Sequence, residues 1–199
     1  MITVRAFVTV AMGLAFGHPV RDHAPAPAPA TPLPTLCAIY TAAVAATGED
    51  SGTVVVLDST FAGIPRFALR AYTNLPQDSA MRAELYPDSV RRALGNVNER
   101  RAPLAACFAA SPRVRLVASD SLVAFFRDGG GWTTFRARYP GARGFRAVSH
   151  PLVAADSASA VVYVMRASDW LAGGGSVLRL ERDASGRWVV RAEMRLWVS

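Results

Sequence analysis

Apolar and polar residues alternate most regularly at the C-terminal end of the chain, over residues 187–198. A period of two is that of a half-buried β-strand. The preceding segment, 176–182, contains Leu178 and Leu180, which must share a buried face with Trp188 if the two segments pair. The pattern therefore predicts a C-terminal hairpin. The apolar face of its second strand would consist of Trp188, Val190, Ala192, Met194, Leu196 and Val198.

The length of the loop in this hairpin follows from the face that both strands share. An even loop would place the leucines beside Arg187 and Arg191, whereas a three-residue loop places them beside apolar residues. Asp183-Ala184-Ser185-Gly186 fits a type I turn with a bulge, in which Gly186 is left-handed. The predicted register pairs Arg182 with Trp188, Leu180 with Val190 and Leu178 with Ala192.

Two more strands are predicted upstream, at 144–149 and 159–166, where β-forming residues cluster. Together with the hairpin they make a four-stranded antiparallel meander. The rest of the chain shows helical patterns and two further apolar strands. The helical patterns lie at 35–47, at 132–139 and within 77–101, where Pro87 interrupts them, and the strands lie at 53–58 and 113–118.

This order of elements, with helices early and strands late, predicts an α+β fold. N-terminal helices would pack on one face of a mainly antiparallel sheet that ends in the meander. NTF2-like and cystatin-like packing are two arrangements that this order allows.

The C-terminal region also carries a recognisable pattern of aromatic, glycine and small residues. Its members are Trp132, Phe135, Tyr139, Pro140, Gly144, Ser149, Ala160, Tyr163, Gly173, Gly175, Leu180, Gly186, Trp188, Trp197 and Ser199. This pattern, W-x2-F-x3-YP followed by G-x-G, G-x-W and W-x-S, resembles a family of uncharacterised exported bacterial proteins. The resemblance implies export and a fold of this kind, but no activity. The chain departs from the family at Ser168, Asp169 and Trp170, where relatives often carry cysteines.

The N-terminus independently predicts export. Arg5 precedes an apolar stretch, 6–16, and Ala15-Phe16-Gly17 forms a small-x-small cleavage site before His18. This is the pattern of a signal peptide, so residues 1–17 are predicted to be cleaved. The apolar stretch is too short to cross a bilayer, which takes about twenty residues.

The remaining chain is predicted to consist of a linker and one domain. Alanine and proline alternate within residues 18–34, which indicates an extended, semi-rigid linker. Residues 35–199 are long enough for a single α+β domain with its own core. The protein is therefore expected in the periplasm or outside the cell, with no transmembrane span after cleavage.

The net charge of +7 rests on arginine alone, because all 22 basic residues are arginine. Such a bias reflects codon usage as much as selection for an anionic partner. Arg91-Arg92 and Arg100-Arg101 are the densest clusters, and they suit either a solvated helix face or contact with an acidic glycan, lipid head group or protein. An anionic envelope component or a small ligand is the partner to expect, and no nucleic-acid-binding motif is visible.

The chain has two cysteines, Cys37 and Cys107. In an oxidising compartment they would form the one available disulfide. That bridge would close a loop of about seventy residues and contribute about 4 kcal/mol in the chain-entropy description. Two buried thiols fit their apolar surroundings equally well, so the sequence leaves both states open.

Residues that could support catalysis are few. His150 is the only histidine in the predicted domain, and the cysteines lack zinc spacing, so neither a metal site nor a cofactor is expected. Ser149 and His150 are neighbours on a predicted strand, so their side chains should point to opposite faces. Asp58 and Thr60, at the end of a strand, suit either ligand binding or capping of the next segment.

Two functions agree with these residues. The first is a non-enzymatic binding or structural module of the cell envelope. The second is a small envelope hydrolase that uses carboxylate and tyrosine groups. A pocket with converging ionisable groups would favour the hydrolase, and a closed apolar core would favour the module. No catalytic residue is predicted, and the candidate binding residues, which also suit packing or capping, are Asp58, Thr60, Trp132, Tyr139, Tyr163 and Trp197.

Overall fold

The computed structural model describes residues 31–46, 52–62, 78–127, 130–170 and 172–198. The chain divides into two units, Met1–Ala30 and Thr31–Ser199, and every described residue belongs to the second unit. The predicted signal peptide, 1–17, and most of the predicted linker, 18–34, lie outside the described residues.

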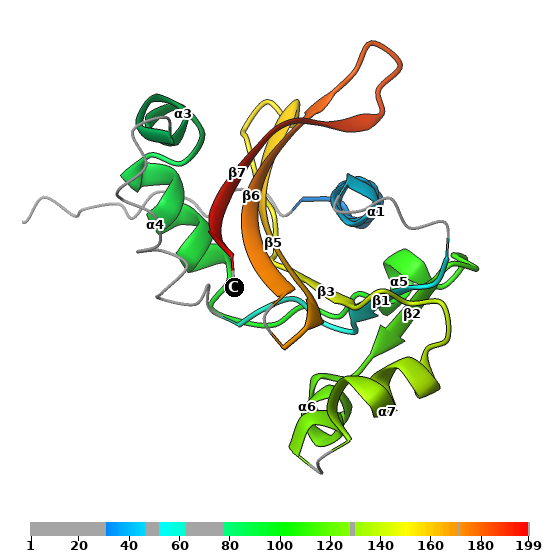
Figure 1. Ribbon diagram of the computed structural model, residues 1–199. Coiled ribbons are helices and arrows are strands. Elements are labelled where there is room, and N and C mark those ends of the chain that lie inside the picture. The colour runs from blue at the N-terminus through cyan, green and yellow to red at the C-terminus, as the bar shows by residue number, and fades with distance from the viewer. Residues whose placement is uncertain (1–30, 47–51, 63–77, 128–129, 171, 199) are drawn as a thin grey trace, which may run out of the picture. The chain divides into compact units, whose positions relative to one another are not determined.

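Seven strands of the second unit form one mixed sheet in the order β2-β1-β3-β5-β6-β7, with β4 paired to β5 (Figure 1). The strands are β1 (Val54–Leu57), β2 (Val114–Val117), β3 (Phe145–Val148), β4 (Leu152–Val153), β5 (Ser159–Asp169), β6 (Ala172–Arg182) and β7 (Trp188–Val198). The helices are α1 (Leu33–Ala46), α3 (Asp78–Leu85), α4 (Asp88–Val97), α5 (Ala105–Phe108), α6 (Ser119–Arg127) and α7 (Gly131–Arg138). The predicted α+β class is confirmed.

The C-terminal meander is also confirmed, because β3, β5, β6 and β7 pair with one another in antiparallel succession. The two residues of β4 add a short pairing beside β5. The strands predicted at 53–58 and 113–118 are β1 and β2, and β1 runs parallel to both β2 and β3. Parallel pairs need long crossover connections, which the helices between these strands supply.

The C-terminal hairpin has the predicted turn. Gly186 has φ +79°, in the left-handed region, and Arg182 pairs with Trp188 and Leu180 with Val190. The third predicted pair is wrong, because a bulge shifts the register so that Leu178 pairs with Glu193.

The bulge changes the face on which the second half of β7 lies. Trp188 and Val190 pack in the cluster beneath α1, whereas Met194 and Leu196 pack with α3 and α4 on the other side of the sheet. The single apolar face predicted for residues 188–198 is therefore divided between two cores.

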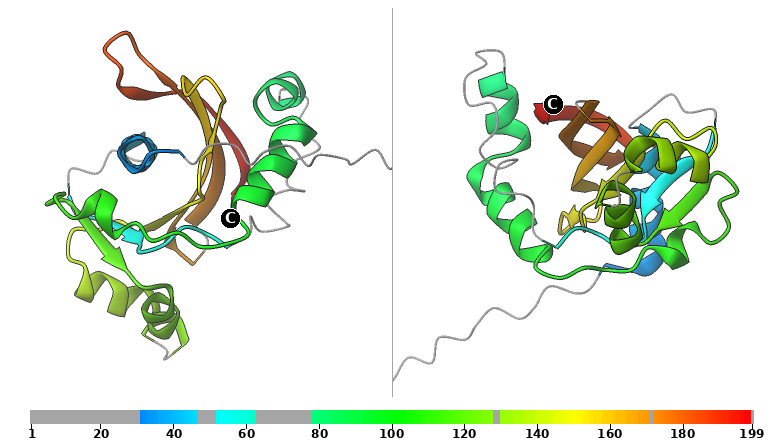
Figure 2. Two further views of the ribbon diagram at one scale, coloured as in Figure 1. Left: turned by 180° about the vertical axis from the view of Figure 1, so that it is seen from behind. Right: turned by 60° about the horizontal axis from the view of Figure 1, so that its bottom comes forward.

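Helices cover both faces of the sheet rather than the one face predicted. Figures 1 and 2 show the sheet curving around α1, with α3 and α4 on its outer side. Helices α6 and α7 contribute to a third cluster with β1 and β3 on that same outer side. The physical reason is that strands such as β1, Val-Val-Val-Leu, are buried at every position and need cover on both faces.

Candidate binding groove

The inner face of the curved sheet is filled by α1. Ile39, Tyr40, Ala43 and Val44 of this helix are buried against apolar residues of the strands. The helix begins at Leu33, two residues before the predicted start of the domain, because proline is tolerated in the first turn, where Pro34 lies. The inner face is thus a closed apolar core.

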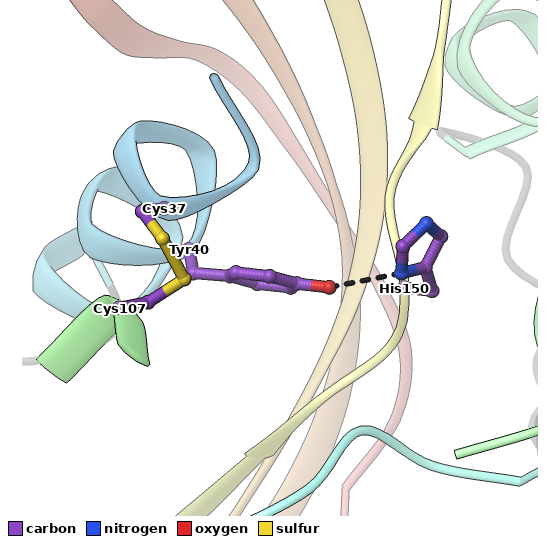
Figure 3. The surroundings of a disulfide bond; sticks show 4 residues. All are labelled: Cys37, Tyr40, Cys107 and His150. Atoms are coloured by element: carbon purple, nitrogen blue, oxygen red, sulfur yellow. Dashed lines mark hydrogen bonds between the residues drawn. A yellow bond between two sulfur atoms is a disulfide. The ribbon is translucent and has the colours of Figure 1, made fainter. Parts of the chain in front are cut away.

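A disulfide between Cys37 and Cys107 ties α1 to α5, so of the two states left open by the sequence the disulfide is the one present. Its partners are 70 residues apart in the chain. Figure 3 shows this bond at the junction of the two helices, with the ring of Tyr40 extending from α1 toward His150.

Tyr40 and His150 form a partly buried polar contact, 3.0 Å between the tyrosine hydroxyl and Nδ1 of the imidazole (Figure 3). Burial raises the pKa of Tyr40 far above its usual value. Burial also lowers the pKa of His150. Both groups are therefore neutral at pH 7, which suits a hydrogen bond between them.

The main chain of His150 is held by Asn98, which follows α4 and is fully buried. The His150 N–H donates to Asn98 Oδ1, at 2.5 Å, and the His150 carbonyl accepts from Asn98 Nδ2, at 2.9 Å. The Ser149 hydroxyl contacts only main chain in this network. It donates to the His150 carbonyl at 3.1 Å and accepts from the Tyr163 N–H at 2.9 Å.

This network connects helices from opposite faces of the sheet, α1 through Tyr40 and α4 through Asn98. The sequence singles out His150 but neither of its partners. The one available signal was a tyrosine on the apolar face of a helix, because a buried tyrosine hydroxyl needs a hydrogen-bond partner.

A groove with a volume of about 680 Å³ lies between α1 and the β6–β7 hairpin. Its α1 side is smooth, since it consists of small residues spaced three or four apart. Its hairpin side holds two arginines and a tryptophan. The lining residues are Pro34, Thr35, Cys37, Ala38, Thr41, Ala42, Ala45, Arg182, Gly186, Arg187 and Trp188.

Arg182 is held in place at this groove by neutral groups. Its Nε donates to the Ser157 carbonyl at 3.2 Å, Nη1 to the Gly186 carbonyl at 3.3 Å and Nη2 to the Thr35 hydroxyl at 3.4 Å. Its guanidinium carbon also lies 5.0 Å from the centre of the Trp188 ring, a cation–π distance. No ion pair joins Arg182 to a carboxylate in the part of the chain that the structure describes.

Arg187 is different, because it has an anionic partner. Its Nη2 lies 3.1 Å from Asp183 Oδ2. Hydrogen bonds from the Ser185 hydroxyl and from the Arg187 main chain lower the pKa of Asp183 to about 2. The carboxylate is therefore ionised throughout the neutral range and offsets the charge of Arg187.

Asp58 and Thr60 lie outside this groove and hold the segment before α5. The carbonyl of Asp58 accepts from the Leu104 N–H at 2.8 Å. Thr60 is 1% exposed, and its hydroxyl accepts from the Ala102 N–H at 2.9 Å. The Thr60 hydroxyl thus bonds a main-chain group that lies 42 residues further along the chain.

Trp132 and Tyr139 belong to an aromatic cluster on the outer face of the sheet. Trp132 is buried and stacks on Phe145, with ring centres 5.9 Å apart and an interplanar angle of 19°. Tyr139 is half-buried and lies 5.2 Å from Phe135, centre to centre. Both side chains therefore have packing roles.

Tyr163 and Trp197 are brought together on the outer face, where the Trp197 Nε1 donates to the Tyr163 hydroxyl at 2.8 Å. Tyr163 is fully buried and Trp197 half-buried. Of the eight candidate binding or disulfide residues, only Cys37 lines the groove, and the sequence pattern gives no sign that Arg182 does.

Comparison with protein-family models finds no match to this chain, and searches among curated proteins and among solved structures find no match either. Within the described ranges, no group of three or more His, Cys, Asp or Glu residues could hold a metal ion. Among the described helices, none is both long and apolar enough to cross a membrane.

Proposed function

We propose that this protein is an exported, non-enzymatic binding or structural module of the cell envelope. The observation that carries the proposal is the filled inner face of the sheet, where α1 and strand residues form a continuous apolar cluster. A closed core of this kind supports a scaffold better than it supports a catalytic cleft. The groove between α1 and the β6–β7 hairpin is then the surface of this scaffold at which a ligand would bind.

Export to the periplasm or the cell exterior is part of the proposal. The Arg5-led apolar pattern over residues 1–17 and the Cys37–Cys107 disulfide both support it. Stable disulfides are typical of oxidising compartments and rare in the cytosol. The resemblance to exported bacterial proteins remains a prediction that agrees with this location.

A small hydrolase is the second candidate, and the observation in its favour is the contact between Tyr40 and His150. A neutral histidine beside a tyrosine is a plausible pair for proton transfer. However, Tyr40 is only 2% exposed and its hydroxyl is already bonded. The pair therefore supports a structural tie more strongly than a reaction with substrate.

Two measurements test the proposal. In a bacterial host that produces the full chain, the product recovered from the periplasm or medium should begin at or near His18. An intact Met1 in the cytoplasmic fraction would contradict export. The purified protein should also show no turnover of chromogenic esters, phosphates or glycosides, and turnover that disappears in His150→Gln would establish the hydrolase instead.

A further inference from the structure

We infer that the groove between α1 and the β6–β7 hairpin binds an anionic amphiphile, with the apolar body along α1 and a carboxylate or phosphate head at Arg182. This inference rests on the proposed binding function and names the chemical class of its ligand. The shape, the lining and the charge of the groove support it.

The α1 side of the groove suits an apolar chain. Ala38, Ala42 and Ala45 recur along one side of the helix with Thr41 between them, and all four line the groove. Small side chains allow a ligand to approach the helix backbone closely. A volume of about 680 Å³ also lies in the range of small-molecule sites, roughly 300–1,000 Å³.

The charge of the groove selects the head group. The described residues that line it include two arginines and no acidic residue. Arg187 is offset by Asp183, so Arg182 supplies the net positive charge. A single anionic group therefore complements the groove better than a neutral or a cationic one does.

Arg182 is also arranged to accept such a head group without first being ordered. Three neutral acceptors and the Trp188 ring already position its guanidinium. A guanidinium has five N–H donors, and three of them are used here, so two remain for a carboxylate or phosphate. Fixing the cation in advance reduces the entropy lost on binding.

Isothermal titration calorimetry of the oxidised protein tests this inference, with decanoate, decyl phosphate and decan-1-ol below their aggregation concentrations. The two anions should bind. Decan-1-ol should have an affinity at least about tenfold lower, because a charge-assisted hydrogen bond would be lost. The two anionic probes distinguish a carboxylate source from a phosphate source.

Three variants locate the binding. Arg182→Gln should weaken decanoate about tenfold while leaving decan-1-ol unchanged. Arg187→Gln is the matched control, and it should change decanoate affinity less because Asp183 already offsets that arginine. Ala38→Trp fills the groove from an exposed position and should abolish binding of all three probes.

Equal affinities for decanoate and decan-1-ol, or binding that Ala38→Trp leaves intact, would overturn the inference. Absence of binding by every probe would overturn it as well. None of these results would contradict the proposed function as an exported, non-enzymatic module, because export and the lack of turnover are measured separately. If Arg182→Gln lowers thermal stability, the Ala38→Trp result and the comparison of the three probes still test whether the groove binds an anionic amphiphile.

Discussion

Gly175 determines how closely the last strand can approach the middle of the sheet. A Cβ atom at this position would collide with the indole Nε1 of Trp197 and with the hydroxyl of Tyr163. These two groups form the hydrogen bond that joins β7 to β5 across β6. The missing side chain is therefore a requirement of this contact.

Replacing Gly175 by alanine should destabilise the fold by about 1–3 kcal/mol, the usual cost of overpacking a core. Urea denaturation followed by far-UV circular dichroism measures this change in the free energy of unfolding.

Gly95→Ala is the matched control. A Cβ atom at Gly95, inside α4, meets nothing within 4 Å, and alanine is the better helix former by up to about 1 kcal/mol. This variant should be slightly more stable than the parent. If Gly175→Ala behaved in the same way, the close approach of Trp197 would be contradicted.

At the scale of residues, important positions are easier to identify from the sequence than the contacts that they make. Tyr163 and Trp197 stand out as aromatic residues in strands, but nothing in their spacing predicts that they meet. Their contact depends on a second shift of register, between Gly175 and Ser176, that places Trp197 opposite Gly175. Such a shift follows from packing on both faces, which a single strand pattern does not record.

At the scale of elements, α1 is attached at two positions within one helical turn. Cys37 joins it covalently to α5, and Tyr40 joins it by a hydrogen bond to the connection between β3 and β4. The helix is thereby fixed both along and around its axis.

Removing the disulfide in the double variant Cys37→Ala/Cys107→Ala should lower the free energy of unfolding by about 4 kcal/mol, since a 70-residue loop is no longer closed in the unfolded chain. Urea denaturation of the variant and of the parent, without reductant, measures the difference. Equal midpoints and slopes would show that the bond does not restrict the unfolded chain.

The position of His150 predicts a loss of stability in weak acid. Its pKa is lowered by burial from the ordinary 6.5, so the unfolded chain binds a proton more readily than the folded protein does. The free energy of unfolding should therefore be constant above about pH 7 and fall as the pH decreases below 6.5. Thermal melts between pH 8 and pH 5 measure this dependence.

Two variants separate the cause of that dependence from the hydrogen bond. His150→Gln removes the titrating group, so its stability should vary less between pH 7 and pH 5.5. Tyr40→Phe keeps the buried histidine, so it should lose about 1 kcal/mol while retaining the pH dependence. An unchanged slope in His150→Gln would show that other groups titrate.

The last strand shows how far periodicity alone predicts an element. The turn at Gly186 and the first pairs of the hairpin follow from the alternation of residues and the turn chemistry. The bulge that includes Arg191 does not, because the apolar period of two continues through it without interruption. Beyond the bulge Met194 and Leu196 pack on the other side of the sheet, where α3 and α4 provide apolar cover.

At the scale of the whole second unit, three apolar clusters hold the sheet and its helices together, one on the inner face and two on the outer face. The class and the meander could be predicted because antiparallel neighbours in the chain are neighbours in the sheet. The parallel pairing of β1 with β2 and β3 could not, because it depends on the path of the intervening helices.

The unit Thr31–Ser199 should fold when produced without residues 1–30, because it is compact in itself and contains every described residue of the three clusters. Its thermal midpoint should equal that of a chain that starts at His18, both with the disulfide formed. A shorter chain that fails to give a cooperative transition would contradict this prediction.

The place of α1 in the chain has a consequence for the timing of folding. This helix precedes every other described element, yet its buried face contacts Leu178, Leu180 and Trp188 from the last two strands. The strands that cover the apolar side of α1 are therefore synthesised last. Contacts so distant in sequence slow folding, so the apolar side of α1 stays exposed to solvent longer than a face covered by its neighbours in the chain.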